Sequence, residues 1–313
     1  MLTEPTPVSP TIRSLALLLT LAFSTPSLAQ SGNSSVTDTQ LSEDESSRTA
    51  TKVEKPQWEL GLAGAGVRVP AYPASSVENQ RGFLVPWFIY RGDKVRFQDG
   101  GLKVIALQNQ RVTIDVSISG SLNADSDNTP LREGMPDLDY LLELGPKVDV
   151  RLWEEDHSGD QRSKLNWSTA LRLAVSTDFS SLSSRGPVLG SRLTYRRQGM
   201  NGGATSFSAS LEGLWTGEKF MDYFYAVDQQ FVTPDRPAFD AEAGYLGSSL
   251  SFGLGHRFNK NVRGFIGLSF AFHQGAKNTD SPLFENETNT GIFGGISWRL
   301  KQSKKTIKVF ESD

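Results

Sequence analysis

Apolar and polar residues alternate one by one along many stretches of this chain. Residues 112–119 alternate Val, Ile, Val and Ile with Thr, Asp, Ser and Ser, and residues 249–254 alternate Ser, Ser and Gly with Leu, Phe and Leu. Successive side chains of a strand point to opposite faces, so each stretch predicts a strand with one apolar face and one polar or small face. Many such strands in an exported chain are typical of a closed barrel in the outer membrane of a Gram-negative cell.

The predicted fold is all β: a transmembrane antiparallel outer-membrane β-barrel of about 12 strands, with 10 to 14 compatible with the pattern. The third strand contains Asp99-Gly100-Gly101, which is either a bulge or a real turn, and this choice changes the count by one. An even count is the rule for single-chain bacterial barrels. The predicted strands are 58–69, 82–91, 94–107, 111–121, 138–153, 163–177, 187–197, 204–216, 219–226, 246–258, 262–273 and 290–300.

The first 29 residues predict a signal peptide that is cleaved after Ala29. Arg13 supplies the positive charge, residues 15–23 are apolar but too few to span a bilayer, and Ser27-Leu28-Ala29 has the small residues of a cleavage site. Residues 30–56 are rich in Ser, Thr, Asp, Glu and Gln and predict a disordered periplasmic leader. The predicted organisation is 1–29 signal peptide, 30–56 leader, 57–300 barrel and 301–313 polar periplasmic tail.

The strand count also predicts which connections lie on which side of the membrane. If both termini are periplasmic, long loops fall outside and short turns inside, as expected for such barrels. Residues 122–137 are the exception, because they are long and polar yet fall on the periplasmic side. The predicted extracellular segments are 70–81, 154–162, 198–203, 227–245 and 274–289; the predicted periplasmic turns are 92–93, 178–186, 217–218 and 259–261.

One strand face combines small and charged residues and predicts the barrel interior. Small residues leave room for larger neighbours, and buried charges must pair, so we expect a lumen crossed by arginine–carboxylate contacts, more plug than open pore. The small residues are Gly61, Ala63, Ala65, Gly253, Gly255, Gly267, Ala271 and Gly295, and the charged ones Arg172, Arg192, Glu212 and Arg257. Aromatics near strand ends predict two interfacial girdles: Trp58, Trp87, Tyr90, Trp153, Trp215, Phe220, Tyr223, Tyr225 and Trp298.

Composition and chemistry add few functional signals. A net charge of −3 suggests no nucleic-acid partner, and the chain has no cysteine. A serine hydroxyl needs a base, and of the three histidines only His157 precedes a serine, within a loop of acidic residues. We predict no catalytic residue, cofactor or metal site; the acidic run from Glu154 to Asp160 could hold a divalent cation, but a solvated charge run is favoured.

Several segments in order resemble the MipA/OmpV family of outer-membrane proteins, named after an MltA-interacting protein. The resemblance covers roughly 58–300 and implies a non-enzymatic barrel in outer-membrane lipid. Members of this family are described as scaffolds that link a murein hydrolase to a murein synthase, or as adhesins and surface antigens. One departure is the end of the chain, where a polar tail follows Leu300 instead of a terminal aromatic residue. The segments are Trp58–Gly64, Pro70–Pro73, Pro86–Gly92, Gly134–Asp137, Leu144–Pro146, Tyr223–Val227 and Ala243–Tyr245.

The main hypothesis is therefore a scaffold for murein hydrolase and synthase. The predicted position of residues 122–137 on the periplasmic side supports it. The alternatives are a surface adhesin acting through 227–245 and 274–289, or a narrow small-solute channel. The candidate partner contacts are Gly134, Met135, Pro136, Asp137 and Asp139; the plainer interpretation of this stretch is a turn that enters a strand.

Overall fold

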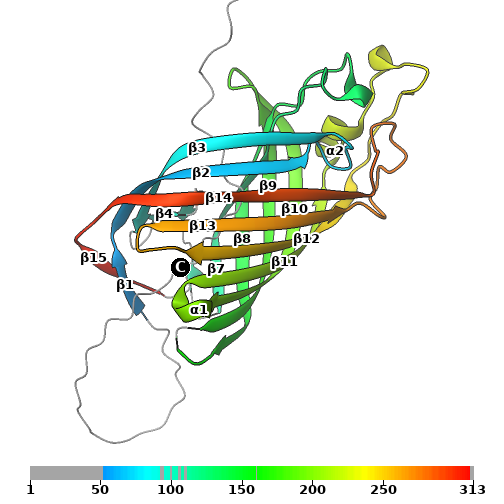
Figure 1. Ribbon diagram of the computed structural model, residues 1–313. Helices are drawn as coiled ribbons and strands as arrows, with labels where there is room; N and C mark the ends of the chain where they lie inside the picture. Colours follow the sequence, from blue (N-terminus) through cyan, green and yellow to red (C-terminus); the bar gives the residue numbers. More distant parts are fainter. Residues whose placement is uncertain are drawn as a thin grey trace, which may run out of the picture.

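The computed structural model describes residues 52–91, 95–98, 101–104, 107–108, 111–159 and 161–310 (Figure 1). The predicted signal peptide, its cleavage site and most of the predicted leader lie outside these residues. None of the helices in the described ranges is long and apolar enough to cross a bilayer.

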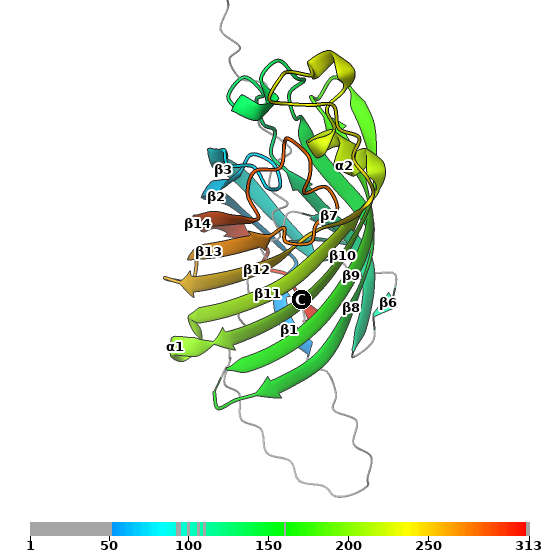
Figure 2. The same ribbon diagram turned by 90° about the vertical axis from the view of Figure 1, so that its right-hand side faces the viewer.

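The described chain is dominated by one antiparallel sheet of long neighbouring strands. In chain order the long strands are β2 (Trp58–Pro70), β3 (Glu78–Arg91), β7 (Val112–Ser121), β8 (Tyr140–Asp156), β9 (Arg162–Thr177), β10 (Leu182–Gly199), β11 (Thr205–Thr216), β12 (Gly244–Arg257), β13 (Val262–Phe272) and β14 (Thr288–Gln302). Sequential strands from β7 to β14 pair with one another, and β14 pairs with β2. Seen from one end, the sheet curls into an arc, the wall of an outer-membrane β-barrel (Figure 2).

The predicted strand 94–107 is divided into three short strands. They are β4 (Val95–Gln98), β5 (Gly101–Val104) and β6 (Leu107–Gln108). Gln98 pairs with Gly101, so the interruption is a hairpin and not a bulge. β5 pairs with β4 while β6 pairs with β7, and β5 and β7 approach within 8 Å. Counted as one interrupted strand, β5 and β6 bring the described strands of this sheet to twelve, which agrees with the predicted number.

The predicted strand 219–226 is wrong, because this segment forms helix α2 (Glu218–Tyr225). Phe220, Met221, Phe224 and Tyr225 are buried, and their spacing places them on one helical face. The aromatic residues that favour a strand by propensity are therefore used here to anchor a helix.

These two changes correct the predicted sidedness. The extra hairpin reverses the direction of every strand from β7 to β11, and the loss of the strand at 219–226 restores the predicted direction afterwards. Residues 122–137 therefore lie at the same end as 70–81, 227–245 and 274–289, and so do 178–186 and 217–218; segments 154–162 and 198–203 lie at the opposite end. We call these the loop end and the terminal end.

The first and the last described strands pair with each other at the terminal end (Figure 1). β1 (Lys52–Pro56) and β15 (Thr306–Phe310) form an antiparallel pair, Lys52 opposite Phe310 and Pro56 opposite Thr306. We call this pair the terminal ribbon. Its two strands belong to the predicted leader and the predicted polar tail, so residues 52–56 are ordered by pairing with a strand from the far end of the sequence.

The outer face of the sheet is apolar, as the alternation predicts. Its large side chains remain exposed, since none of the described segments covers them: Leu84, Leu144, Leu173, Leu211, Ile266 and Ile296 are each more than half exposed. Trp153, Trp215, Trp298 and Tyr90 are also exposed, as expected of membrane-interface residues. Phe220, Tyr223 and Tyr225 do not join a girdle, because they lie in α2. Trp87 does not either, because its ring covers Gly61.

Candidate functional site in the lumen and the loop cap

The loop end is covered by connections that pack on one another. We call residues 71–77, 122–139, 217–243 and 273–287 the loop cap; it includes the 3-10 helices η1 (Pro130–Arg132) and η2 (Gln229–Phe231). Tyr72, Leu138, Met221 and Tyr225 form its apolar core together with strand residues such as Leu141. The cap thus has a hydrophobic core of its own, continuous with the rim of the barrel.

Hydrogen bonds across large sequence separations hold the loop cap together. The Tyr72 hydroxyl donates to the Leu283 carbonyl oxygen at 2.8 Å, and the Tyr225 hydroxyl to that of Pro73 at 3.1 Å. Arg236 donates from Nη1 to the carbonyl oxygens of Leu131 and Glu133, at 2.8 and 3.0 Å.

Burial raises the pKa of Tyr223 to about 12, with the Asp139 carboxylate as the second cause.

The predicted contact residues are part of this cap. Gly134 adopts a positive φ of 77°, and the Pro136 carbonyl oxygen accepts from Ser126 Oγ at 2.7 Å. Asp137 Oδ1 accepts from the Ser126 backbone N–H at 2.8 Å, and the Asp139 carbonyl oxygen accepts from the Tyr223 hydroxyl at 3.1 Å. These residues shape the turn that enters β8.

Met135 belongs to the same turn, and its backbone N–H donates to the Arg132 carbonyl oxygen at 2.9 Å. Burial, followed by the charge of Asp178, raises the pKa of Asp139. The whole segment lies at the loop end, so 122–137 shares an end with the segments predicted to be extracellular and not with the turn at 259–261 that was predicted to be periplasmic.

The lumen face contains arginine–carboxylate pairs, as predicted. Arg172 Nε donates to Glu143 Oε2 at 2.7 Å, and both side chains are about nine-tenths buried. Arg192 Nη2 donates to Glu212 Oε2 at 2.7 Å. Arg257, which we expected in a similar pair, instead donates to the Gly203 carbonyl oxygen at 3.3 Å. These two pairs neutralise charge at their own positions in the wall, while Arg257 shows that not every lumen arginine has a carboxylate partner.

Small lumen residues accommodate the aromatic side chains of neighbouring strands. Gly61 lies opposite Trp87, and Gly267 lies opposite Phe293. A Cβ atom added at either glycine would overlap the facing ring. Gly295 receives Phe265 in the same way. The glycines leave room for larger neighbours, as predicted, but at these three positions the neighbours are aromatic rings and not the charged side chains that we expected.

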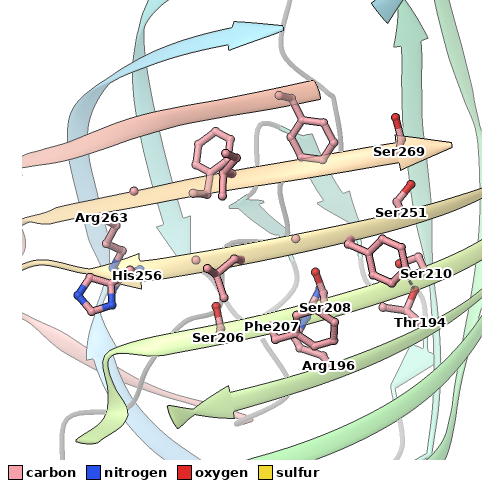
Figure 3. A pocket seen from close by; sticks show the side chains of 18 of the residues that line it. Thr194, Arg196, Ser206, Phe207, Ser208, Ser210, Ser251, His256, Arg263 and Ser269 are labelled. Carbon is pink, nitrogen blue, oxygen red and sulfur yellow. Dashed lines mark hydrogen bonds between the residues drawn. The ribbon is translucent and has the colours of Figure 1, made fainter. Parts of the chain in front are cut away.

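A cavity of about 300 Å³ remains on the lumen side of β10 to β14 (Figure 3). Figure 3 shows serine side chains from three neighbouring strands along it. Its hydroxyl-bearing residues are Thr194, Ser206, Ser208, Ser210, Ser249, Ser251, Ser269 and Ser297. Thr194 and Ser210 are linked by a hydroxyl–hydroxyl hydrogen bond of 3.2 Å. No sequence motif marks this cavity, because its residues come from separate strands and meet only through the register.

The carboxylates of the acidic hairpin between β8 and β9 form ion pairs with basic side chains. Glu154 lies 2.6 Å from Arg151 Nη1 and 3.2 Å from Lys164 Nζ. Asp156 accepts from Arg162 Nε at 2.5 Å. These carboxylates are therefore engaged by side chains of the protein.

A histidine–serine pair occurs beside this hairpin. His157 Nε2 lies 2.9 Å from Ser163 Oγ, and His157 Nδ1 lies 3.8 Å from Glu155 Oε1. A catalytic serine needs such a base, but it also needs room for a substrate carbonyl. Ser163 is only 1 % exposed, so the pair fastens the hairpin and we assign no reaction to it.

The comparisons with known proteins identify the family. The family model described as MltA-interacting protein MipA matches residues 61–300. The chain belongs to the MipA family. The matched range begins within β2 and ends within β14, so it covers the barrel wall and the loop cap. A search of the curated proteins gave no match.

Solved structures similar in fold are outer-membrane proteins of low sequence identity. An outer membrane channel from Pseudomonas putida F1 is 11 % identical, with a TM-score of 0.44, covering 83 % of this chain and 100 % of that chain. A bacterial polysaccharide outer membrane secretin is 9 % identical (TM-score 0.32; 78 % and 99 % covered). Outer membrane phospholipase A from Escherichia coli is 10 % identical (TM-score 0.29; 78 % and 93 % covered). We take no functional argument from these likenesses.

Proposed function

We propose that this MipA-family barrel is a non-enzymatic outer-membrane anchor that holds murein hydrolase, and through it murein synthase, at its terminal end. The observation that carries the proposal is the match to a family described as MltA-interacting protein. In outer-membrane barrels long loops are extracellular and short turns periplasmic. The loop cap then faces outward and the terminal ribbon faces the periplasm, where murein lies.

The terminal ribbon is suited to a protein partner. A pair of strands outside the main sheet has free edges that can accept a further strand. Lys301, Lys304 and Lys305 are exposed next to the ribbon. The anchor would therefore bind through β1, β15 and the lysines beside them, and not through 122–137.

Site-specific photo-crosslinking in cells tests this proposal. A photoreactive residue at Lys304 is expected to capture a murein hydrolase, identified by mass spectrometry, whereas one at Asn128 in the exposed part of the cap is not. Deleting residues 306–313 should abolish capture from Lys304 and leave the barrel in the membrane. Capture of the hydrolase from Asn128 alone would contradict the proposal.

A second candidate function is surface recognition by the loop cap. The observation in its favour is that the cap is a packed structure with its own core, and ordered long loops often carry function. Loss of binding to a host surface after replacement of residues 122–137, with hydrolase capture from Lys304 unchanged, would support it. Unchanged host binding after that replacement would count against it.

A further inference from the structure

The lumen cavity has an excess of positive charge. Among its charged lining residues, four are arginines and one is a glutamate. The glutamate, Glu212, already accepts a hydrogen bond from Arg192 at 2.7 Å. Arginine is costly to desolvate without a counter-charge, so the surroundings of two of these arginines, Arg257 and Arg263, call for an explanation.

Two of the arginines face each other directly. Arg257 of β12 and Arg263 of β13 are opposite in the register, and like charges in this position repel. Arg257 donates to a carbonyl oxygen, which carries no full charge. The described part of the chain shows no hydrogen bond or ion pair of the Arg263 side chain, although its backbone belongs to the sheet. Its partner in the register on β14 is Ser297, whose hydroxyl lines the same cavity.

The Glu59 carboxylate at this end of the lumen is shared by two arginines. Glu59 lies 2.7 Å from Arg91 Nη2 and 2.9 Å from Arg299 Nη1. Glu59 is therefore engaged by Arg91 and Arg299, and the described residues show no ion pair for Arg257 or Arg263.

The same region offers space and neutral donors. Gly253, Gly255 and Gly264 line the cavity and contribute no side chain, while Ser206 and Ser297 present hydroxyl groups. Figure 3 shows Arg263 together with serine side chains of neighbouring strands around this space. A guanidinium group donates two parallel hydrogen bonds to a carboxylate or phosphate, and a hydroxyl can complete the shell.

We propose that the lumen holds a binding site for the carboxylate or phosphate group of a small solute, formed by Arg257, Arg263 and Ser297. The bound anion separates the two facing arginines electrostatically and replaces the carboxylate that the wall does not supply. A volume of about 300 Å³ admits a small organic anion and excludes a folded partner. The site does not depend on the proposed anchoring of murein hydrolase, which concerns the terminal ribbon and the lysines beside it.

The test measures anion binding and thermal stability of the full-length protein in detergent. The probes are inorganic phosphate and glutarate, with glucose as a neutral control. In chloride-poor buffer each binding anion should raise the unfolding midpoint of the wild-type protein, since a ligand stabilises the state that binds it. Arg263→Gln should weaken binding at least tenfold and remove the shift.

Arg68→Gln is the matched control. Arg68 lies at the loop end, pairs with Glu78 and is outside the cavity, so its loss removes the same charge but should leave anion binding unchanged. Arg263→Gln should also raise the midpoint without anion, because it relieves repulsion, and this shows that the variant folds.

Binding of phosphate alone assigns the site to phosphorylated solutes, and binding of glutarate assigns it to carboxylates. Binding of neither anion overturns the proposal. Equal weakening by Arg68→Gln and Arg263→Gln overturns it as well, because the effect would then come from overall charge.

Discussion

The two ends of this barrel are built from different interactions. The loop end is closed by a hydrophobic core in which Tyr72, Met221 and Tyr225 are almost completely buried. The terminal end has an arginine cluster around Glu59 and a ribbon of two strands. Apolar packing is non-directional and resists change, whereas unmatched charge and free strand edges invite a ligand or a partner. The difference suggests that one end seals the barrel and the other binds.

We expect the largest loss of stability when the buried Arg172–Glu143 ion pair, which lies in the wall between the two ends, is broken. Arg172→Met leaves Glu143 buried without its partner and should lower the free energy of unfolding by about 3–5 kcal/mol. Chemical unfolding in detergent measures the loss. The double variant Arg172→Met/Glu143→Leu should recover most of it, and a double variant as unstable as the single one would show that the pair is not what matters.

Removing a buried side chain from the loop cap should destabilise the loop end and leave the terminal end unchanged. Phe224→Ala opens a cavity beneath the helix, and such changes cost about 3–5 kcal/mol when the ring is fully buried. Hydrogen exchange should therefore accelerate across 122–139 and 217–243 while the strands stay protected. Phe258→Ala is the control, because Phe258 is 61 % exposed at the terminal end. Equal acceleration in both variants would mean that the ends are not independent.

The lumen glycines give a smaller, local effect. Gly267→Ala places a Cβ atom against the Phe293 ring and should cost about 1–3 kcal/mol, as overpacking does. Gly82→Ala is the matched control, since a Cβ at Gly82 meets no atom within 4 Å. A Gly267→Ala variant as stable as Gly82→Ala would refute the close packing of ring and glycine.

Alkaline pH should weaken the loop end selectively. The pKa of Tyr223 is raised to about 12 in the folded protein, from its ordinary value near 10. The unfolded chain thus loses this proton first, so the contribution to stability is complete below pH 10 and declines as the pH rises towards 12. Hydrogen exchange of the cap as a function of pH measures the decline, and Tyr223→Phe should reduce it but not remove it, because burial also raises the pKa of Tyr72 and Tyr225 in the cap. An unchanged slope in Tyr223→Phe would assign the effect to other groups.

The sequence predicts the wall of the barrel better than its ends. Alternation is a local property, so the outward faces of β8 and β12 and the glycines beneath Trp87 and Phe293 follow from it. The helix at 218–225 was missed because Tyr223-Phe224-Tyr225 has the composition of a strand. The helical spacing of its apolar residues becomes visible only once the buried residues of the segment are distinguished from the exposed ones.

The contacts of the cap could not be derived from neighbouring residues. Tyr72 and Leu283 are 211 positions apart, and their hydrogen bond depends on the complete circuit of strands. The lumen cavity is the same kind of feature, because its arginines and serines come from five strands. A single hairpin at 98–101 also reversed the predicted side of 122–137, which shows how strongly sidedness depends on one turn.

The most direct test of the account is which end faces the outside of the cell. The chain has no cysteine, so single-cysteine variants at Asn128 and Lys304 can be labelled without background. Both positions are exposed, one in the loop cap and one beside the terminal ribbon. A membrane-impermeant maleimide applied to intact cells should label the cysteine at 128, and should label that at 304 only after the outer membrane is permeabilised. Labelling of 304 but not 128 on intact cells would contradict the proposed orientation and the anchoring function that rests on it.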